Sequence, residues 1–321
     1  MVDERRFLER ALELAERGRG TTAPNPVVGA VVALNGEILG EGWHERPGGP
    51  HAEVVALEAA GERARGATLY VTLEPCAHHG RTPPCAETVG AAGLARVVVA
   101  VGDPDPRTNG RGFERLRAAG VVVEQAGEEL EWRARVQNEG FRTRVELGRP
   151  FVTYKAAVSL DGRVTVPGSR WVTGEESRRR VHELRAQADA VAVGMGTVRA
   201  DDPRLDARGV DAPRQPRRLA FGRGPLPAGS ELELRSGPLE DELRALAGEG
   251  VQKLLLEGGP TLATSFLRAG LVDQLLLFVA PRLSGSGPRF LGDLERPLDL
   301  LHVTVERAGA DIVLGGYLRV P

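Results

Sequence analysis

Strand-like and helix-like patterns alternate along this 321-residue chain in two runs, with one interruption between them. A β-branched run over residues 27–34 ends at Asn35-Gly36, a pair typical of two-residue hairpin turns, and helical and strand periodicities follow in turn. Charge, glycine and proline break this pattern over residues 138–150, after which it restarts. Since domains commonly hold about 150 residues, we expect two α/β domains, at residues 1–145 and 146–321.

Composition narrows the class of protein. Hydrophobic residues make up 41% of the chain and charged residues 27%, as in ordinary folded proteins, and the net charge is −2. Because the basic clusters at 178–180 and 214–218 are short, we expect no nucleic-acid partner. No apolar run approaches the roughly 20 residues of a membrane span, and the charged N-terminus lacks a signal-peptide pattern. We therefore expect no membrane association and a cytoplasmic location.

The strongest pattern in the first half combines one histidine with two cysteines. His51 is followed by Glu53, and Cys76 and Cys85 come later with eight residues between them. Zinc prefers deprotonated nitrogen and sulfur ligands, and one imidazole with two thiolates leaves a fourth tetrahedral position for water. We expect His51, Cys76 and Cys85 to bind Zn²⁺, with Glu53 beside the ion as the catalytic base that moves protons.

The spacing of His51 and Glu53 restricts where this site can be. Two residues apart in the middle of a helix, their side chains would point about 200° away from each other. They can serve one site only at a helix N-terminus, and the expected helix begins at Ala52. The alternative is a structural zinc site with His78 or His79 as a fourth ligand, but such a site gives no reason for Glu53.

The motifs around these residues carry a family resemblance. A His-x-Glu sequence followed by Pro-Cys and a second cysteine is the pattern of zinc-dependent nucleobase deaminases, which usually have two residues between the cysteines. Together with Asn-Pro-Val-Val-Gly at 25–29, Gly-Trp-His at 42–44, Gly-Gly-Pro-His-Ala-Glu at 48–53 and the stretch 72–85, it resembles the RibD family, the bifunctional deaminase–reductases of riboflavin biosynthesis. In that family the eight-residue spacing is usual.

The resemblance implies a cytidine-deaminase-like three-layer α/β/α domain at the N-terminus. Its reaction would be hydrolysis of the 2-amino group of a diaminopyrimidinone that carries ribosylamine 5-phosphate. By the same resemblance, Asn25 would contact this substrate, and the long loop between the cysteines would cover the pyrimidine.

Two glycine-containing turns in the second half could meet a phosphate. Residues 254–261 predict a strand, a two-glycine turn and a helix start, an arrangement that directs backbone N–H groups and a helix dipole at an anion. Gly194-Met195-Gly196 is similar to the start of a dinucleotide-binding fingerprint, but Arg199 stands where the third glycine belongs. A Rossmann domain is therefore disfavoured.

The motifs at 155–163, 169–173, 196–203 and 257–261 resemble the reductase half of the same family. The resemblance implies a dihydrofolate-reductase-like α/β domain that uses NADPH and forms a homo-oligomer, a dimer or larger. The implied NADPH contacts are Ala157, Trp171, Thr197, Asp201, Gly259, Pro260, Thr261, Leu262, Ala263, Thr264 and Ser265. The implied substrate contacts, whose arginines suit a phosphate, are Ser169, Arg185, Leu205, Arg208 and Glu257.

One departure from the family pattern stands out. Family members usually place an acidic residue and a small hydroxyl after the strand that here reads 218–221, whereas this chain has Gly222-Arg223. On charge alone, we hypothesise that Arg223 meets the 2′-phosphate of NADPH. The region after Pro281 is also short for the family.

The sequence leaves other functions open. A cytidine, guanine or tRNA-adenosine deaminase with an inert appendage would release ammonia from a different substrate. A zinc-stabilised nucleotide sensor would bind metal and NADPH without turnover. Within the favoured function, the proton donor at the reduced carbon stays open between Lys155 and Asp201.

Overall fold

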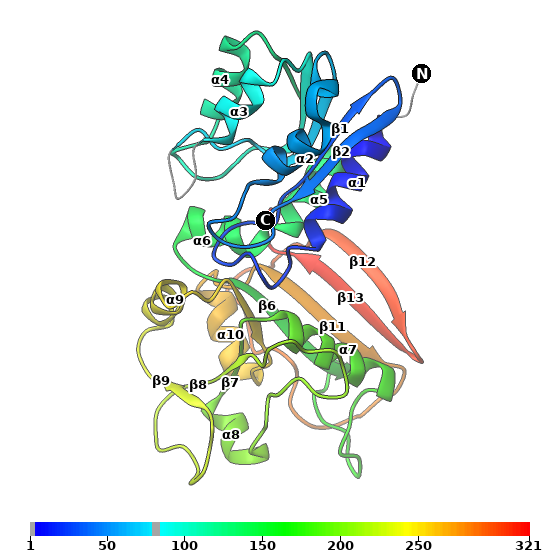
Figure 1. Ribbon diagram of the computed structural model, residues 1–321. Helices are drawn as coiled ribbons and strands as arrows, with labels where there is room; N and C mark the ends of the chain where they lie inside the picture. Colours follow the sequence, from blue (N-terminus) through cyan, green and yellow to red (C-terminus); the bar gives the residue numbers. More distant parts are fainter. Residues whose placement is uncertain (1–3, 79–83) are drawn as a thin grey trace. The chain divides into compact units, whose positions relative to one another are not determined.

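The computed structural model describes residues 4–78 and 84–321. The chain divides into two compact units, Met1–Leu147 and Gly148–Pro321, each with its own sheet and core (Figure 1). His79 and most of the expected covering loop, at 79–83, lie outside the described residues.

The first unit is built on a five-stranded sheet with the order β2-β1-β3-β4-β5. Strand β1 is antiparallel to β2 and β3, whereas β3, β4 and β5 are parallel. Since parallel strands end at one edge of a sheet, the segments that follow β3 and β4 come out side by side. The strands are β1 Gly29–Leu34, β2 Glu37–Trp43, β3 Thr68–Leu73, β4 Arg96–Val101 and β5 Val122–Gln125.

Helices cover both faces of this sheet, which makes three layers. Successive strand side chains point to opposite faces, so Val97 and Val99 lie in one core and Val98 and Ala100 in the other. The first core is closed by α2 (Ala52–Ala60), α3 (Cys85–Ala91) and α4 (Arg111–Ala118), and the second by α1 (Arg5–Glu16) and α5 (Glu128–Gln137). A 3₁₀ turn at Gly61–Ala64 follows α2.

Helix α2 lies directly against the backbone of β2, because two glycines face it. A Cβ on Gly42 would lie 2.3 Å from the carbonyl oxygen of Ala52, and a Cβ on Gly40 would lie 2.2 Å from that of Ala56. Side chains two apart on a strand share a face, so the two glycines together leave the space that the helix fills. The position of the start of α2 is thereby fixed.

The second unit is built on an eight-stranded sheet with the order β12-β13-β11-β6-β10-β7-β8-β9. All neighbouring pairs from β11 to β9 are parallel, and β13 and β12 are added antiparallel at one edge. The strands are β6 Phe151–Ser159, β7 Ala190–Gly194, β8 Arg217–Phe221, β9 Glu233–Arg235, β10 Lys253–Leu256, β11 Gln274–Ala280, β12 Leu301–Ala308 and β13 Asp311–Tyr317.

Four helices cover the two faces of this second sheet. On one face, α9 (Leu239–Gly248) and α10 (Pro260–Arg268) bury Leu243 and Phe266 against the strands. On the other face, α7 (Glu175–Gln187) and α8 (Met195–Asp201) contribute Val181 and Val198 to two smaller clusters. The parallel strands are thus buried on both sides, as α/β sheets require.

The structure corrects one expectation about the segment between the domains. The break over 138–150 is not an irregular linker for most of its length, because α6 spans Glu139–Leu147. Its sequence is rich in charge, and the buried Arg142 docks it by donating from Nη1 to the carbonyl oxygen of Gly102 at 2.9 Å. Within the described ranges, no helix has the length and apolar character needed to cross a bilayer.

Candidate functional site

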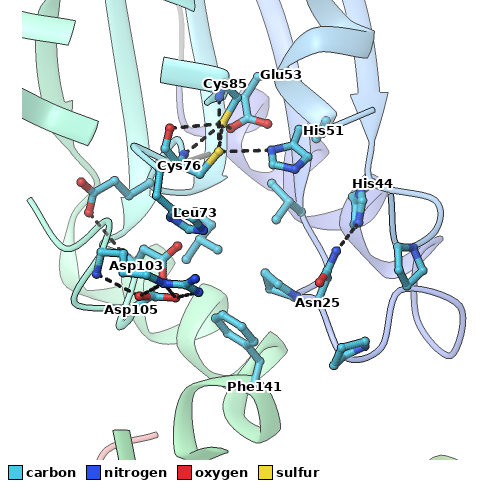
Figure 2. Close-up of a pocket in the computed structure, with 18 of the residues that line it drawn as sticks. Asn25, His44, His51, Glu53, Leu73, Cys76, Cys85, Asp103, Asp105 and Phe141 are labelled. Atoms are coloured by element: carbon cyan, nitrogen blue, oxygen red, sulfur yellow. Dashed lines mark hydrogen bonds and ion pairs between the residues drawn. The ribbon is translucent and has the colours of Figure 1, made fainter. Parts of the chain in front are cut away.

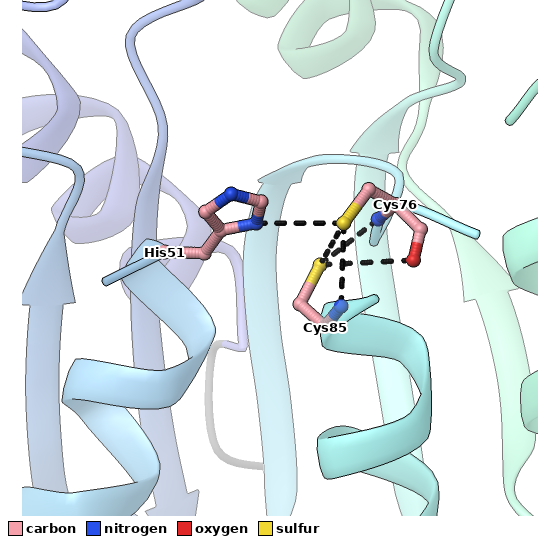
Figure 3. A group of neighbouring side chains, drawn as sticks. All are labelled: His51, Cys76 and Cys85. Atoms are coloured by element: carbon pink, nitrogen blue, oxygen red, sulfur yellow. Dashed lines mark hydrogen bonds between the residues drawn. The ribbon is translucent and has the colours of Figure 1, made fainter. Parts of the chain in front are cut away.

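Three ligand-type side chains of the first unit converge at one end of its parallel strands (Figure 3). His51 is the residue just before α2, Cys76 follows β3, and Cys85 is the first residue of α3. His51 Nδ1 lies 3.5 Å from Cys76 Sγ, and the two sulfurs are 3.1 Å apart. All three ligand atoms lie within 4.8 Å of one another.

Each of the two sulfurs accepts a hydrogen bond from the backbone of the other cysteine. The amide of Cys76 donates to Cys85 Sγ at 2.9 Å, and the amide of Cys85, at the start of α3, donates to Cys76 Sγ at 3.2 Å. The hydrogen bond from the Cys85 thiol, with help from the His51 imidazole, lowers the pKa of Cys76, whereas burial raises the pKa of Cys85. Both thiols must lose their protons to bind a cation, and the two backbone N–H groups favour that loss.

The donor set fits zinc. Two ligands on one tetrahedral zinc ion are separated by roughly 3.5–3.8 Å, which matches the 3.5 Å between His51 Nδ1 and Cys76 Sγ, whereas the two sulfurs, 3.1 Å apart, would have to separate on binding. His78, the possible fourth ligand, is instead hydrogen-bonded through Nδ1 to Thr108 Oγ1 at 3.1 Å. Among the residues that the structure describes, the group has three members, and His79, the other candidate for a fourth ligand, lies outside them.

Glu53 reaches the same place from the first turn of α2. Its side chain is buried, and Oε1 lies 3.2 Å from Cys85 Sγ. Burial raises the pKa of Glu53 above its usual value, with the nearby His51 opposing the shift. His51 and Glu53 thus line the same cavity, because both stand at the helix start.

A cavity of about 360 Å³ opens beside this group, and Figure 2 shows Asn25 and His44 on one side of it with Asp103 and Asp105 across from them. His44 Nδ1 is 3.0 Å from the carbonyl oxygen of Pro50, which can only accept, so Nδ1 carries the proton and Nε2 is the acceptor. Asn25 Nδ2 donates to that Nε2 at 3.1 Å. The Asn25 amide is therefore oriented, with its Oδ1 unused by any residue described.

The opposite side of the cavity was not predicted from the sequence. Asp103 and Asp105 follow β4, and Arg107 pairs with Asp105, Nε to Oδ1 at 3.0 Å. Burial raises the pKa of Asp103 to about 7. The buried Glu74 carboxylate fixes this loop by accepting backbone N–H groups from Asp103, Gly110, Gly112 and Phe113.

In the second unit, three charged side chains meet at Glu257, the residue that directly follows β10. Glu257 accepts from Arg185 Nε at 2.6 Å and from Arg185 Nη2 at 3.0 Å, and Lys155 Nζ lies 3.6 Å from Glu257 Oε2. Burial lowers the pKa of Lys155, and Glu257 opposes that shift. Burial also acts on Glu257, but Lys155 and Arg185 together hold its pKa below the usual value.

The structure brings only some of the expected cofactor and substrate residues into contact. Gly259 precedes α10, which begins at Pro260 and includes residues 261–265, and Thr197 and Asp201 lie on α8. Ala157 is on β6, Leu205 is buried, and Ser169 donates to the carbonyl oxygen of the exposed Trp171 at 2.8 Å. Arg185 meets Glu257, whereas Arg208 pairs with Asp206 at 2.5 Å.

Known proteins match both units. Residues 1–101 match the family model of the cytidine and deoxycytidylate deaminase zinc-binding region. Residues 150–227 and 231–314 match the model of the RibD C-terminal domain.

Curated relatives and solved structures match nearly the whole chain. The riboflavin biosynthesis proteins RibD of Aquifex aeolicus and Escherichia coli are each 41% identical to it, with 97% and 89% of either chain covered. The structure of Acinetobacter baumannii RibD is 38% identical, with a TM-score of 0.83 and 98% of both chains covered. The diaminohydroxyphosphoribosylaminopyrimidine deaminase/5-amino-6-(5-phosphoribosylamino)uracil reductase of Thermotoga maritima is 34% identical, with a TM-score of 0.82 and 97% coverage. These structures confirm the two predicted fold types.

Proposed function

The chain belongs to the RibD family, the bifunctional deaminases and reductases of riboflavin biosynthesis that use zinc and NADPH, and from this premise we propose how its residues divide the work. Residues 1–145 deaminate 2,5-diamino-6-ribosylamino-4(3H)-pyrimidinone 5′-phosphate. Residues 146–321 then reduce the ribosyl group to a ribityl side chain. The observation that carries the proposal is the convergence of His51, Cys76 and Cys85 with the buried Glu53 beside one cavity.

His51, Cys76 and Cys85 would hold the zinc ion. Bound zinc lowers the pKa of water from 15.7 to about 9 or below, which supplies hydroxide near neutral pH. The N–H groups of Cys76 and Cys85 donate to the two sulfurs and so favour the thiolates that would bind the ion, and the glycine-lined contact of α2 with β2 keeps His51 in place.

Glu53 would move the protons of the deamination. Its carboxylate takes the proton of the attacking water and delivers it to a ring nitrogen, and a second transfer leaves the departing amine as ammonia. Burial suits this exchange, because it raises the pKa of Glu53 toward the working pH. Asn25 would accept a hydrogen bond from the pyrimidine, since His44 occupies its amide nitrogen and leaves Oδ1 available.

In the second unit, NADPH supplies a hydride to the ribose carbon of the substrate. The chain would bind this cofactor with Ala157, Trp171, Thr197, Asp201 and residues 259–265 at the carboxyl ends of the strands. Ser169, Arg185, Leu205, Arg208 and Glu257 would bind the deaminated substrate. Arg185 holds Glu257 in one orientation, and Lys155 lies against the same carboxylate.

A coupled assay tests the division of labour. Wild-type protein given the diaminopyrimidinone phosphate and NADPH should release ammonia and then consume NADPH. The variant Glu53→Ala should retain zinc, release no ammonia, and still oxidise NADPH when the deaminated substrate is supplied. Ammonia release at the wild-type rate in Glu53→Ala would overturn the role of Glu53. If the protein were instead a nucleotide sensor, or a deaminase with an inert C-terminal domain, the wild type would oxidise no NADPH.

We also propose that the protein is a homo-oligomer, formed through β12. This strand is at the edge of its sheet, and Val303 and Val305 are 53% and 65% exposed. Such an edge presents unpaired backbone groups beside apolar side chains and readily pairs with a second copy. Light scattering should show a dimer or larger, and the double change Val303→Asp and Val305→Asp should give monomers. Val122→Asp on the edge strand β5, where the valine is 56% exposed, is the matched control.

A cytoplasmic location agrees with the state of the cysteines. Cys76 and Cys85 are free thiols, and they can bind zinc only while reduced. Cell fractionation with thiol labelling should recover the protein with unoxidised cysteines in the cytosolic fraction.

A further inference from the structure

A second cavity, of about 430 Å³, lies at the carboxyl ends of β8 and β9 in the second unit. Its walls are the end of β8 at 221–223, the turn into α9 at 235–239, and Leu262 and Ser265 of α10. In α/β proteins, ligands bind at this edge of a parallel sheet. Leu262 also borders the Gly258-Gly259 turn, since a Cβ on Gly258 would lie 2.9 Å from its Cδ2. The cavity therefore adjoins the segment proposed to bind NADPH.

Two arginines line this cavity, and they differ in their partners. Arg235 is 14% exposed and pairs with Glu249 at 2.8 Å, with Glu233 at 3.4 Å and with Glu242 at 3.5 Å. Arg223 is exposed, and its guanidinium has no hydrogen bond or ion pair with any part of the chain that the structure describes. The charge of Arg235 is neutralised within the fold, so Arg223 supplies the available positive charge.

The backbone that carries Arg223 is held in place from α8. Arg199 donates from Nη2 to the carbonyl oxygen of Arg223 at 2.8 Å. Gly222 has φ +131°, and a Cβ there would lie 3.1 Å from Met195 Cγ, so a side chain at this position would be strained. A side chain is therefore disfavoured at position 222, and Arg223 is the first residue after β8 that carries one.

The charges around the cavity fit a phosphate monoester. None of the side chains that line it within the described residues is acidic, and Ser236 and Ser265 add hydroxyl groups. NAD-binding sites commonly use a carboxylate to bind the ribose diol, whereas an arginine accommodates the 2′-phosphate of NADP. That phosphate carries about −1.5 to −2 charge, which an unpaired guanidinium can bind by charge-assisted hydrogen bonds.

We propose that Arg223 binds the 2′-phosphate of NADPH and sets the preference of this reductase for NADPH over NADH. The proposal rests on the reductase function proposed above for the second unit. Arg199 is a positioning residue. It holds the carbonyl oxygen of Arg223 and would act on the cofactor phosphate only by keeping Arg223 in place.

Binding measurements on the full-length, zinc-loaded protein test the proposal without turnover. Calorimetric titration with NADPH and with NADH gives two dissociation constants for each variant. Arg223→Gln should weaken NADPH binding by roughly ten- to a hundredfold, the value of one lost charge-assisted contact, and leave NADH binding unchanged. Arg223→Lys should lie between Arg223→Gln and the wild type, since it keeps the charge but not the planar fork.

Arg244→Gln is the matched control, because it removes the same charge from the exposed surface of α9, where Arg244 pairs with Glu240 and Asp241. It should bind both nucleotides as the wild type does. Unchanged NADPH binding in Arg223→Gln overturns the proposal, and so does an equal loss for NADPH and NADH, which would indicate a merely structural loop. A wild-type protein that binds neither nucleotide would overturn the reductase function itself, and the proposal with it.

Discussion

Arg185 and Glu257 form a two-pronged ion pair, with side chains only 14% and 9% exposed. Arg185 Nη1 also donates to the carbonyl oxygen of Asp206 at 3.1 Å. Three of the five guanidinium N–H groups are therefore used inside the fold, which leaves two that could meet a substrate phosphate. The same carboxylate faces Lys155, so its orientation governs how that ammonium is held.

Replacement of Arg185 should damage the reductase alone. Arg185→Lys keeps the charge but cannot bind both carboxylate oxygens, so we expect kcat/KM for NADPH oxidation to fall roughly ten- to a hundredfold. Arg185→Met removes one partner of a buried pair and should lower the free energy of unfolding by about 3 kcal/mol. Ammonia release from the same preparations is the control, and an equal fall there would indicate general misfolding.

His44 should act on the deaminase through Asn25. Without the acceptor Nε2, the Asn25 amide can rotate, so His44→Ala should raise the KM for the diaminopyrimidinone phosphate about tenfold with a smaller effect on kcat. Both changes remove the same interaction with the substrate. The KM of the double variant His44→Ala/Asn25→Ala should therefore be no higher than that of Asn25→Ala alone. Additive losses would show that the two side chains act independently.

Metal removal should separate the two activities. A strong chelator should abolish ammonia release, leave NADPH oxidation of the deaminated substrate intact, and expose both thiols to a thiol reagent. Added Zn²⁺ should reverse all three changes, and Cys76→Ser should fail to recover. Acid should also release the metal, because His51 and the thiolates must be deprotonated to bind. A chelated protein that still releases ammonia would contradict the metal site.

Asp103 should make stability depend on pH. Burial raises its pKa from 3.8 to about 7, so the folded protein binds more protons at this residue than the unfolded chain does. Stability from this residue is complete below about pH 4 and is lost as the pH rises through 7. Asp103→Asn, which can still accept from the amide of Asp105, should therefore gain stability over the wild type at pH 8, by up to about 4 kcal/mol, and little at pH 4. Urea unfolding at the two pH values measures the difference.

Local signals account for the parts of the fold that could be predicted. The hairpin was predictable because Asn35 and Gly36 both adopt positive φ, 52° and 87°, and few other pairs do so without strain. Helix α6 was missed because Arg142 docks it by a hydrogen bond rather than by an apolar stripe. Strand β12 was missed as well, although Leu301, Val303 and Val305 alternate with polar residues in its sequence; seven of its eight residues are exposed.

The same reasoning explains what could be predicted of the sites. Histidine and cysteine are rare in this chain, so His51, Cys76 and Cys85 stand out by residue type and motif. Asp103 and Arg107 do not, because charged residues make up 27% of the sequence. Only the fold places them on the cavity, through the position of β4 and the backbone groups that Glu74 gathers.

The geometry of the proposed metal site depends on Gly42, a residue that is not itself a ligand. The histidine and the acid stand together on a helix that rests on bare strand backbone, while both sulfurs belong to other segments. A methyl group at Gly42 would push that helix outward as one body and carry imidazole and carboxylate away from the thiols together. A Gly42→Ala variant would therefore bind the metal more weakly, although every coordinating residue would remain in its sequence.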